Sequence, residues 1–304
     1  FFPGGIIQSA YEAGFSGFHL HRYLIKNGKN NSVVHPASIE VSSRDRVKTD
    51  KRDAKKIAIQ LAAGRLRGIF VPDEAQEAKR STSRLRVHFW QHRTRVGQQL
   101  KSLLFTQGLI AISDETRICK KWIDQKLTEI EQGNYSRDFF YTVKQYAEEW
   151  QNLTQKMKEI EKQLQIQAEG DSALHTIYTS VPGIGLVHAR ELSNELGNMS
   201  QFKNEKKLFS YVGLTPSEYS SGEHVRQGHI SRQGRSLLRK ILVEAAWVAI
   251  KKDPSLRSIY DRLAPLRGSK RAIVGVARRL VGRIRSCLVN GTLYEIQSIT
   301  RNIA

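Results

Sequence analysis

The chain has 304 residues, and its 49 Lys and Arg residues outnumber its 29 Asp and Glu residues, which gives a formal net charge of +20. A field of this sign attracts polyanions such as nucleic acids. Hydrophobic residues make up 39% of the sequence, so the chain can bury true cores and is not a disordered basic tail. Its length indicates two or three domains.

Cysteine content and hydropathy exclude several classes of protein. Only Cys119 and Cys287 are present, far apart and without a CxxC pair, so we predict free thiols, no disulfide framework, no zinc site and a reducing cytosol. No apolar run approaches the ~18 residues of a membrane span. The opening stretch FFPGGIIQSA lacks a basic segment before an apolar core, so we expect neither a membrane segment nor a signal peptide.

Short strands and helices alternate over residues 1 to about 80. The stretches GGIIQSAYEAG and NSVVHPASIEV are predicted strands, and FHLHRYLIKNG between them is a predicted helix that ends at Gly28. The stretch DKRDAKKIAIQLAAG predicts a basic amphipathic helix that ends at Gly64. This order of elements is typical of an α/β layer.

The middle of the chain is predicted to be long-helical. A basic helix from Ser81 to about Leu109 carries His88 and His92 at i, i+4, but no third metal ligand lies nearby in sequence, so a metal site there is disfavoured. Steps of three and four residues then define a heptad seam: Phe139, Val143, Tyr146, Trp150, Leu153, Met157, Ile160 and Leu164. An antiparallel hairpin with an earlier helix and a dimer contact both explain such a seam.

A tight bend follows the heptads. Pro182, Gly183 and Gly185 separate two predicted helices in TIYTSVPGIGLVHARELSNELG, an arrangement that is similar to a helix-hairpin-helix. In that motif the glycine-rich turn and the next helix N-terminus offer backbone N–H groups to a phosphate. A plain helix–helix turn is the alternative.

The run YSSGEHVRQGHISRQGRSLLRKILVEAA, Tyr219 to Ala246, combines serines, histidines and arginines in front of an apolar helix. A polar turn is its ordinary interpretation. Chemically, the run offers a hydroxyl nucleophile, a glycine that permits close approach, and imidazoles for proton transfer. Its candidate phosphate-binding residues are Gly222, Arg226, Arg232 and Arg239, and its candidate proton carriers are His224 and His229.

A strongly basic segment closes the chain. The segment from Arg262 to Tyr294 contains no acidic residue, and its apolar residues recur at helical spacing. We expect its basic side chains to line a polyanion contact on the opposite side: Arg262, Arg267, Lys270, Arg271, Arg278, Arg279, Arg283 and Arg285.

Five blocks in register resemble one family. They are YEAGFSGFHLHRYL, RVKTDKRDA, SVPGIG, LFSYVGLTPSEYSSG and HISRQGRSLLRKILVEAA. By these blocks the chain resembles the DEDD transposases, or recombinases, of bacterial insertion sequence family 110. It is most similar to subgroup 1111 of that family, and the Piv-type DNA invertases are relatives. The resemblance covers most of the chain.

The resemblance implies an α/β plus α architecture. It consists of an incomplete RNase H-like (RuvC-like) domain over 1–112 whose first strands are absent from the chain, a helical coiled coil over 113–170, and a mainly helical C-terminal transposase domain over 171–304 with the helix-hairpin-helix-like element. It also implies a bacterial, nucleoid-associated cytoplasmic protein. The expected partners are double-stranded DNA, an element-encoded guide (bridge-type) RNA and further copies of the chain in a dimer or tetramer, with no membrane.

The family pattern assigns acidic residues and a serine. Glu12 matches the Glu of YEAG, and Asp50 and Asp53 match the two Asp of TDxxD, which together imply a Mg²⁺ or Mn²⁺ site. Without the resemblance, Asp50 and Asp53 are favourable charges at a helix N-terminus that Thr49 could cap. The serine directly before the glycine, Ser221, matches the nucleophile, with Ser220 as the second choice.

The first Asp of the family quartet has no counterpart, because none of the residues before Glu12 is acidic. Either a segment upstream of Phe1 completes the quartet, which we expect, or the metal site is incomplete. The leading function is a transposase that cuts and rejoins DNA through a 5′-phosphoserine intermediate. The alternatives are a metal-dependent Holliday-junction-type nuclease and a catalytically inactive transposase-derived nucleic-acid-binding protein.

Overall fold

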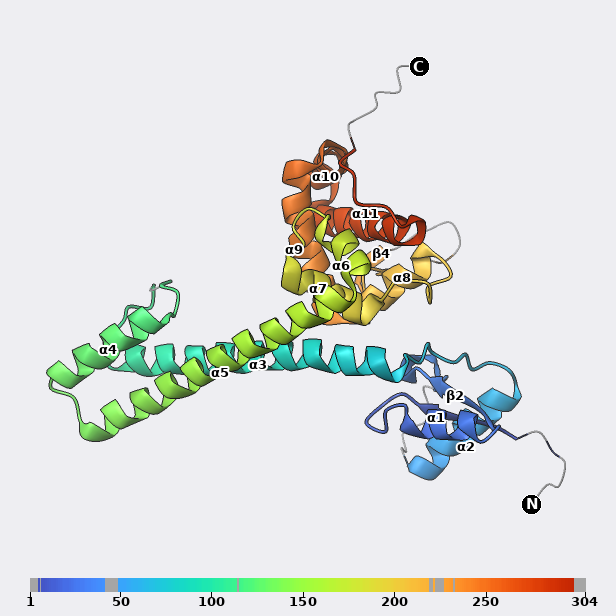
Figure 1. The fold of residues 1–304 in the computed structure, drawn as a ribbon, viewed down its shortest axis with the longest axis horizontal. Helices are drawn as coiled ribbons and strands as arrows, with labels where there is room; N and C mark the ends of the chain where they lie inside the picture. The colour runs from blue at the N-terminus through green and yellow to red at the C-terminus, as the bar shows by residue number, and fades with distance from the viewer. Residues whose placement is uncertain are drawn as a thin grey trace, which may run out of the picture. The chain divides into compact units, whose positions relative to one another are not determined.

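A computed structural model describes residues 5, 7–41, 49–113, 115–218, 221, 227–231 and 233–297 of the chain (Figure 1). The chain divides into two compact units, Phe1–Glu74 and Ala75–Ala304. The described residues are mostly helical, with two sheets of two strands each. No helix among them combines the length and hydropathy that crossing a membrane requires.

The first unit contains a parallel pair of strands joined by a helix. Its elements are β1 (Gln8–Glu12), α1 (His19–Lys26), β2 (Asn30–Val34), a short 3-10 turn (Pro36–Ser38) and α2 (Asp50–Ala62). Glu12 pairs with Val34 at the end of the ladder, and α2 packs against β1. The predicted α/β order is therefore observed, whereas the RNase H-like assignment and the boundaries at 112 and 170 stay predictions.

Local signals explain where these helices begin and end. Gly28 and Gly64 follow α1 and α2 with φ of 68° and 66°, a left-handed conformation that glycine adopts without strain. Thr49 caps α2, because its Oγ1 accepts a hydrogen bond from the Arg52 N–H at 3.4 Å. The side-chain amide of Gln60, which is buried in α2, binds the backbone of Glu40 through both its oxygen and its nitrogen.

A helical hairpin begins the second unit. It consists of α3 (Glu74–Thr106), α4 (Lys120–Gln132) and α5 (Arg137–Gly170), and in Figure 1 the chain returns along α5, which crosses α3 in the opposite direction. Pairs along the hairpin follow one antiparallel register: Arg86 contacts Glu161 at 2.7 Å, and the Arg93 guanidinium lies 5.5 Å from the ring centre of Trp150. All eight heptad positions are buried or half-buried. Within the chain the seam packs against two earlier helices, α3 and α4, in agreement with the hairpin alternative, and the dimer contact stays a prediction.

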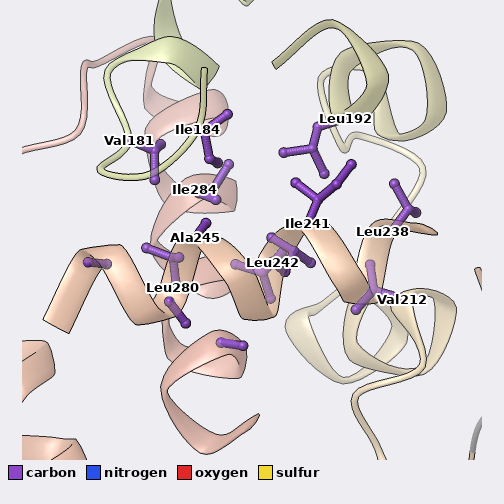
Figure 2. Close-up of a cluster of buried hydrophobic side chains, with 14 of the residues drawn as sticks. Val181, Ile184, Leu192, Val212, Leu238, Ile241, Leu242, Ala245, Leu280 and Ile284 are labelled. Carbon is purple, nitrogen blue, oxygen red and sulfur yellow. The ribbon is translucent and has the colours of Figure 1, made fainter. Parts of the chain in front are cut away.

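A compact helical body follows the hairpin. Its elements are α6 (Ser172–Thr179), α7 (Leu186–Leu196), α8 (Glu205–Val212), β3 (Pro216–Glu218), β4 (Gln227–Ile230), α9 (Ser236–Lys252), α10 (Pro254–Arg267) and α11 (Ser269–Asn290). Figure 2 shows side chains from the 181–185 turn, α7, α8 and α11 gathered around α9. Leu242 and Ala245 of α9 are 0% exposed, so α9 is the central helix of this body.

Candidate functional site

The three predicted acidic residues lie in the first unit. Glu12 is the last residue of β1, and Asp50 and Asp53 occupy the first turn of α2, which packs against that strand. Glu12 and Asp50 are exposed, whereas Asp53 is half-buried and its Oδ1 lies 3.2 Å from the Lys56 Nζ. Glu12 was predicted at the end of a strand and Asp50 and Asp53 at the start of a helix, and the structure has both elements there, while the role of these residues stays a prediction.

The fit of these carboxylates to a divalent cation is incomplete. Carboxylate oxygens are the ligands that Mg²⁺ and Mn²⁺ prefer. Within the ranges that the structure describes, however, no three His, Cys, Asp or Glu side chains come together as a group that could hold a metal ion. Glu12, Asp50 and Asp53 therefore do not form such a site as they stand, and neither do His88 and His92.

Ser221 lies in a β-hairpin of the second unit. Strands β3 and β4 pair antiparallel, with Pro216 opposite Ile230. Ser221 lies on their connection and is exposed, and the Ser217 hydroxyl donates to the His229 carbonyl oxygen at 3.0 Å across the hairpin. The other residues predicted for this loop, Ser220, Gly222, His224, Arg226 and Arg232, lie outside the described residues.

The base of this hairpin is fixed by two glycines. Gly213 and Gly234 have φ of 73° and 89°. A Cβ at Gly213 would collide with the Gln233 carbonyl oxygen, and one at Gly234 would collide with the Tyr211 carbonyl oxygen. Arg239, a predicted phosphate contact, donates from Nη1 to the Gly213 carbonyl oxygen at 3.4 Å and thereby also holds the base.

A buried ionic layer connects the hairpin helices with the start of α9. The Glu195 carboxylate is 2% exposed, lies 2.7 Å from the Arg84 Nε and lies 3.9 Å from the Nε of Arg235, which directly precedes α9. Glu191, one turn earlier and 1% exposed, lies 3.1 Å from an Arg86 Nη. Burial raises the pKa of Glu191, although the charge of Arg86 opposes this.

Sequence reasoning missed this layer. Glu191 and Glu195 are four positions apart on a predicted helix, and such a pair is ordinarily interpreted as two exposed charged side chains. Spacing in RELSNEL could indicate only that Glu191 and Glu195 share one helix face.

The turn between α6 and α7 places its two glycines in different surroundings. Gly183 has φ of 86°, and a Cβ there would lie 2.8 Å from the Val248 Cβ and 2.9 Å from the Ala245 Cα of α9. Gly185 precedes α7 and has no neighbour within 4 Å of such a Cβ. Packing against α9 explains Gly183, and only Gly185 leaves open space for an approaching ligand.

Helix α11 carries the predicted basic surface. Arg271 and Arg279 are exposed, and the Arg278 guanidinium lies 4.9 Å from the ring centre of Phe209. Two arginines of the basic segment do not line an outer face as the pattern predicts. Arg283 lies 2.8 Å from the buried Asp253 carboxylate, and Arg285 donates to the Phe202 carbonyl oxygen at 3.1 Å, because the interior of the body offers each of them an acceptor.

Asp253 anchors the junction of α9, α10 and α11. Its side chain is 0% exposed and accepts the backbone N–H groups of Ser255 and Leu256 at the start of α10. Burial alone would raise the pKa of Asp253, but hydrogen bonds from Tyr294 and these amides, with the charge of Arg283, lower it overall. Burial and the bond to Asp253 raise the pKa of Tyr294 to about 12.

Two family models match the chain over the regions that hold these residues. A model described as Transposase IS116/IS110/IS902 family matches residues 175–261, which include the 181–185 turn and Ser221. A model of DEDD transposases of the IS110 type matches residues 10–106, which include Glu12, Asp50 and Asp53.

Curated relatives align with most of the chain. A putative transposase (y4qE) of Sinorhizobium fredii is 30% identical over 288 residues, or 94% of this chain and 70% of the relative. A probable family 20 transposase of Pseudomonas aeruginosa is 27% identical over 80% of this chain and 71% of its own length. The transposase for insertion sequence element IS1111A of Coxiella burnetii is 22% identical over 91% of this chain and 76% of its own length. The chain therefore belongs to the IS110 family of transposases, which are DNA-cutting enzymes.

Proposed function

We propose that the chain cuts and rejoins DNA through a covalent 5′-phosphoserine bond at Ser221. The observation that carries this proposal is the exposure of Ser221 on a hairpin whose base is fixed by Gly213 and Gly234, within the region that matches a transposase family. A nucleophile for a large substrate needs to be accessible and to stand on a rigid support. The exposure of Ser221 and the fixed base of its hairpin support this assignment.

The chemistry conserves the number of phosphodiester bonds. The Ser221 Oγ attacks the phosphorus, forms an O–P bond and breaks the bond to the 3′ oxygen, which leaves as a 3′ hydroxyl after taking up a proton. A base receives the serine proton. Of the two candidate histidines, His229 on β4 is the one that lies among the residues that the structure describes. Attack by the 3′ hydroxyl of another strand then reverses these steps and frees the serine, so that rejoining needs no ATP.

The serine is tested by the fate of a covalent adduct. Full-length protein is incubated with DNA of the element's ends, and protein–DNA complexes that survive denaturant are quantified. We expect Ser221→Ala to abolish the adduct and Ser220→Ala to retain it, with the modified peptide located by mass spectrometry. Metal-dependent cutting that survives both changes would instead support a nuclease in which water attacks, and binding without any cleavage would support the inactive alternative.

The acidic residues enter the proposal as part of a divalent-cation site. Glu12, Asp50 and Asp53 are its candidate ligands for Mg²⁺ or Mn²⁺, and further ligands are needed because these three do not form a metal-holding group. The test is Mn²⁺ titration of the full chain, in which Asp50→Asn should weaken binding. The exposed Asp138, in the first turn of α5, provides the matched control Asp138→Asn.

An RNA guide and further copies of the chain are the proposed partners. Base pairing by a guide would read the DNA sequence, so the protein needs mainly backbone contacts, for which a net charge of +20 is suited. The carboxylates and Ser221 lie in separate units, so a site that uses both must be assembled by docking within or between subunits. Sequencing of co-purified RNA and the mass of the complex in solution test the two partners separately.

A further inference from the structure

A hollow of about 460 Å³ lies between α8 and α11 in the second unit. Small-molecule sites typically occupy about 300–1,000 Å³. Among its lining residues are Glu205, Phe209, Arg278, Arg279, Gly282 and Arg283. Its wall thus joins an aromatic ring, guanidinium groups and one carboxylate.

The charges in this hollow are not paired with each other. Arg283 lies against Asp253, but among the described residues Arg278 and Arg279 form no ion pair, and Glu205 makes neither an ion pair nor a hydrogen bond. Opposite charges that share a hollow without pairing retain their binding capacity for a ligand. A fitting ligand carries an anion for the arginines and N–H donors for the carboxylate.

Neighbouring groups hold these side chains in place. The Asn204 side chain caps α8 by accepting the Lys207 N–H, which fixes the first turn that carries Glu205. A Cβ at position 282 would lie 2.8 Å from the Glu205 Oε1, so glycine lets the carboxylate lie against α11. The ring of Phe209 holds the Arg278 guanidinium at the wall through a cation–π contact of 4.9 Å.

We infer that this hollow binds a single unpaired nucleotide of the nucleic acid, with guanine as the preferred base; this rests on the proposed function. Arg279 would contact the phosphate, and the base would stack on the Arg278 guanidinium, a common mode for splayed bases. The N1–H and N2–H₂ groups of guanine are parallel donors that match the two oxygens of Glu205. Inosine lacks the N2 amino group, and thymine and uracil offer a single imino N–H.

The inference is tested with full-length protein and duplexes that carry one unpaired nucleotide. Guanine, inosine and thymine bulges in DNA, and guanine, inosine and uracil bulges in RNA, are compared by fluorescence anisotropy. We expect guanine to bind about tenfold more tightly than inosine, the effect of one hydrogen bond to a charged group. The strand type that shows this ratio identifies the source of the nucleotide, and a ratio near one in both would overturn the inference.

Variants assign the preference to the hollow. Glu205→Gln should reduce the guanine-to-inosine ratio to near one, whereas Glu131→Gln, an exposed carboxylate of α4 outside the hollow, should leave it unchanged. Gly282→Ala keeps the net charge but displaces the Glu205 carboxylate, so it should reduce the ratio too. A ratio that both hollow variants retain would refute the assignment even if one of them folded poorly.

The adduct at Ser221, measured on the same preparations, separates this inference from the proposed function. An adduct that forms without any guanine preference in the wild-type protein overturns only the inference. A guanine preference without any adduct overturns only the phosphoserine mechanism.

Discussion

Replacement of Gly183 by Ala tests whether close packing against α9 requires a glycine at this position. Its φ of 86° requires the left-handed region, and the new Cβ would lie 2.8 Å from the Val248 Cβ and 2.9 Å from both the Cα and the carbonyl oxygen of Ala245. Two of these neighbours belong to the backbone of α9, the central helix of the body. The contact can therefore be relieved only if the turn moves away from α9.

The magnitude follows from two terms. A left-handed conformation costs an alanine about 1–2 kcal/mol, and overpacking a close-packed contact costs about 1–3 kcal/mol. Gly183→Ala should therefore lower the free energy of unfolding of the second unit by about 2–5 kcal/mol. Gly185 has φ of −84° and no neighbour within 4 Å of a built Cβ, so Gly185→Ala should change it by less than about 0.5 kcal/mol.

Urea unfolding of the full chain, with hydrogen exchange of the α7 and α9 amides to assign the transition, measures both variants. DNA affinity is measured alongside, and a phosphate bound at the turn should weaken in Gly185→Ala even though the fold is kept. A Gly183→Ala protein as stable as the wild type would refute the packing argument. Equal destabilisation by both changes would also refute it, since the structure distinguishes the two positions.

Three further predictions concern buried polar groups and a helix cap. Arg190→Met removes a guanidinium that is 2% exposed and donates to the Asn194 Oδ1 and the Gln167 carbonyl oxygen, so the free energy of unfolding in urea should fall by about 1–3 kcal/mol; an unchanged stability would contradict this. Burial lowers the pKa of His175, so the unfolded chain binds its proton first and stability should decrease as pH falls below 6.5. His175→Leu should flatten this part of the pH–stability curve, and an unchanged slope would show that other groups cause it. Thr49→Ala should destabilise α2 by about 1 kcal/mol, seen as faster hydrogen exchange of its amides; unchanged exchange would show that the cap is not needed.

Local signals in the sequence were sufficient for the elements of the first unit. Gly28, Gly64 and Thr49 act within one turn of their helices, so their roles depend on neighbours in sequence. The strands were correctly located but are shorter than the predicted stretches, because the ladder ends at Glu12 and Val34. Helix α3 begins at Glu74, before the predicted Ser81, since nothing in the intervening sequence breaks it.

The partner of the heptad seam could not be read from the sequence. Periodicity shows which face of a helix is apolar but not what covers it. In the structure α3 and α4 both pack against α5, and pairs such as Arg86 with Glu161 are consistent with one antiparallel register of α3 and α5. The seam residues are thus buried or half-buried within one chain, so the seam by itself is not evidence for a second copy.

The sequence also could not predict which charged side chains are buried, and Arg283 shows why. In sequence it belongs to the same basic helix as Arg279, yet it turns inward because Asp253, thirty residues earlier, needs a cation in a dry environment. Only the fold decides which arginines of α11 are used for its own stability and which remain for a ligand. The number of arginines in α11 therefore exceeds the number that can contact phosphates.

Gly213, Gly234 and the buried Glu195 lie close together at the base of the hairpin that carries Ser221. Gly213 and Gly234 fix where the hairpin leaves the body, and Arg235, the residue after Gly234, lies beside a carboxylate that also binds Arg84 of the long hairpin. The Glu195 carboxylate thus lies between an arginine of α3 and the arginine that follows Gly234 at the base of the hairpin. A substitution at Glu195 should therefore affect both α3 and the base of the hairpin that carries Ser221.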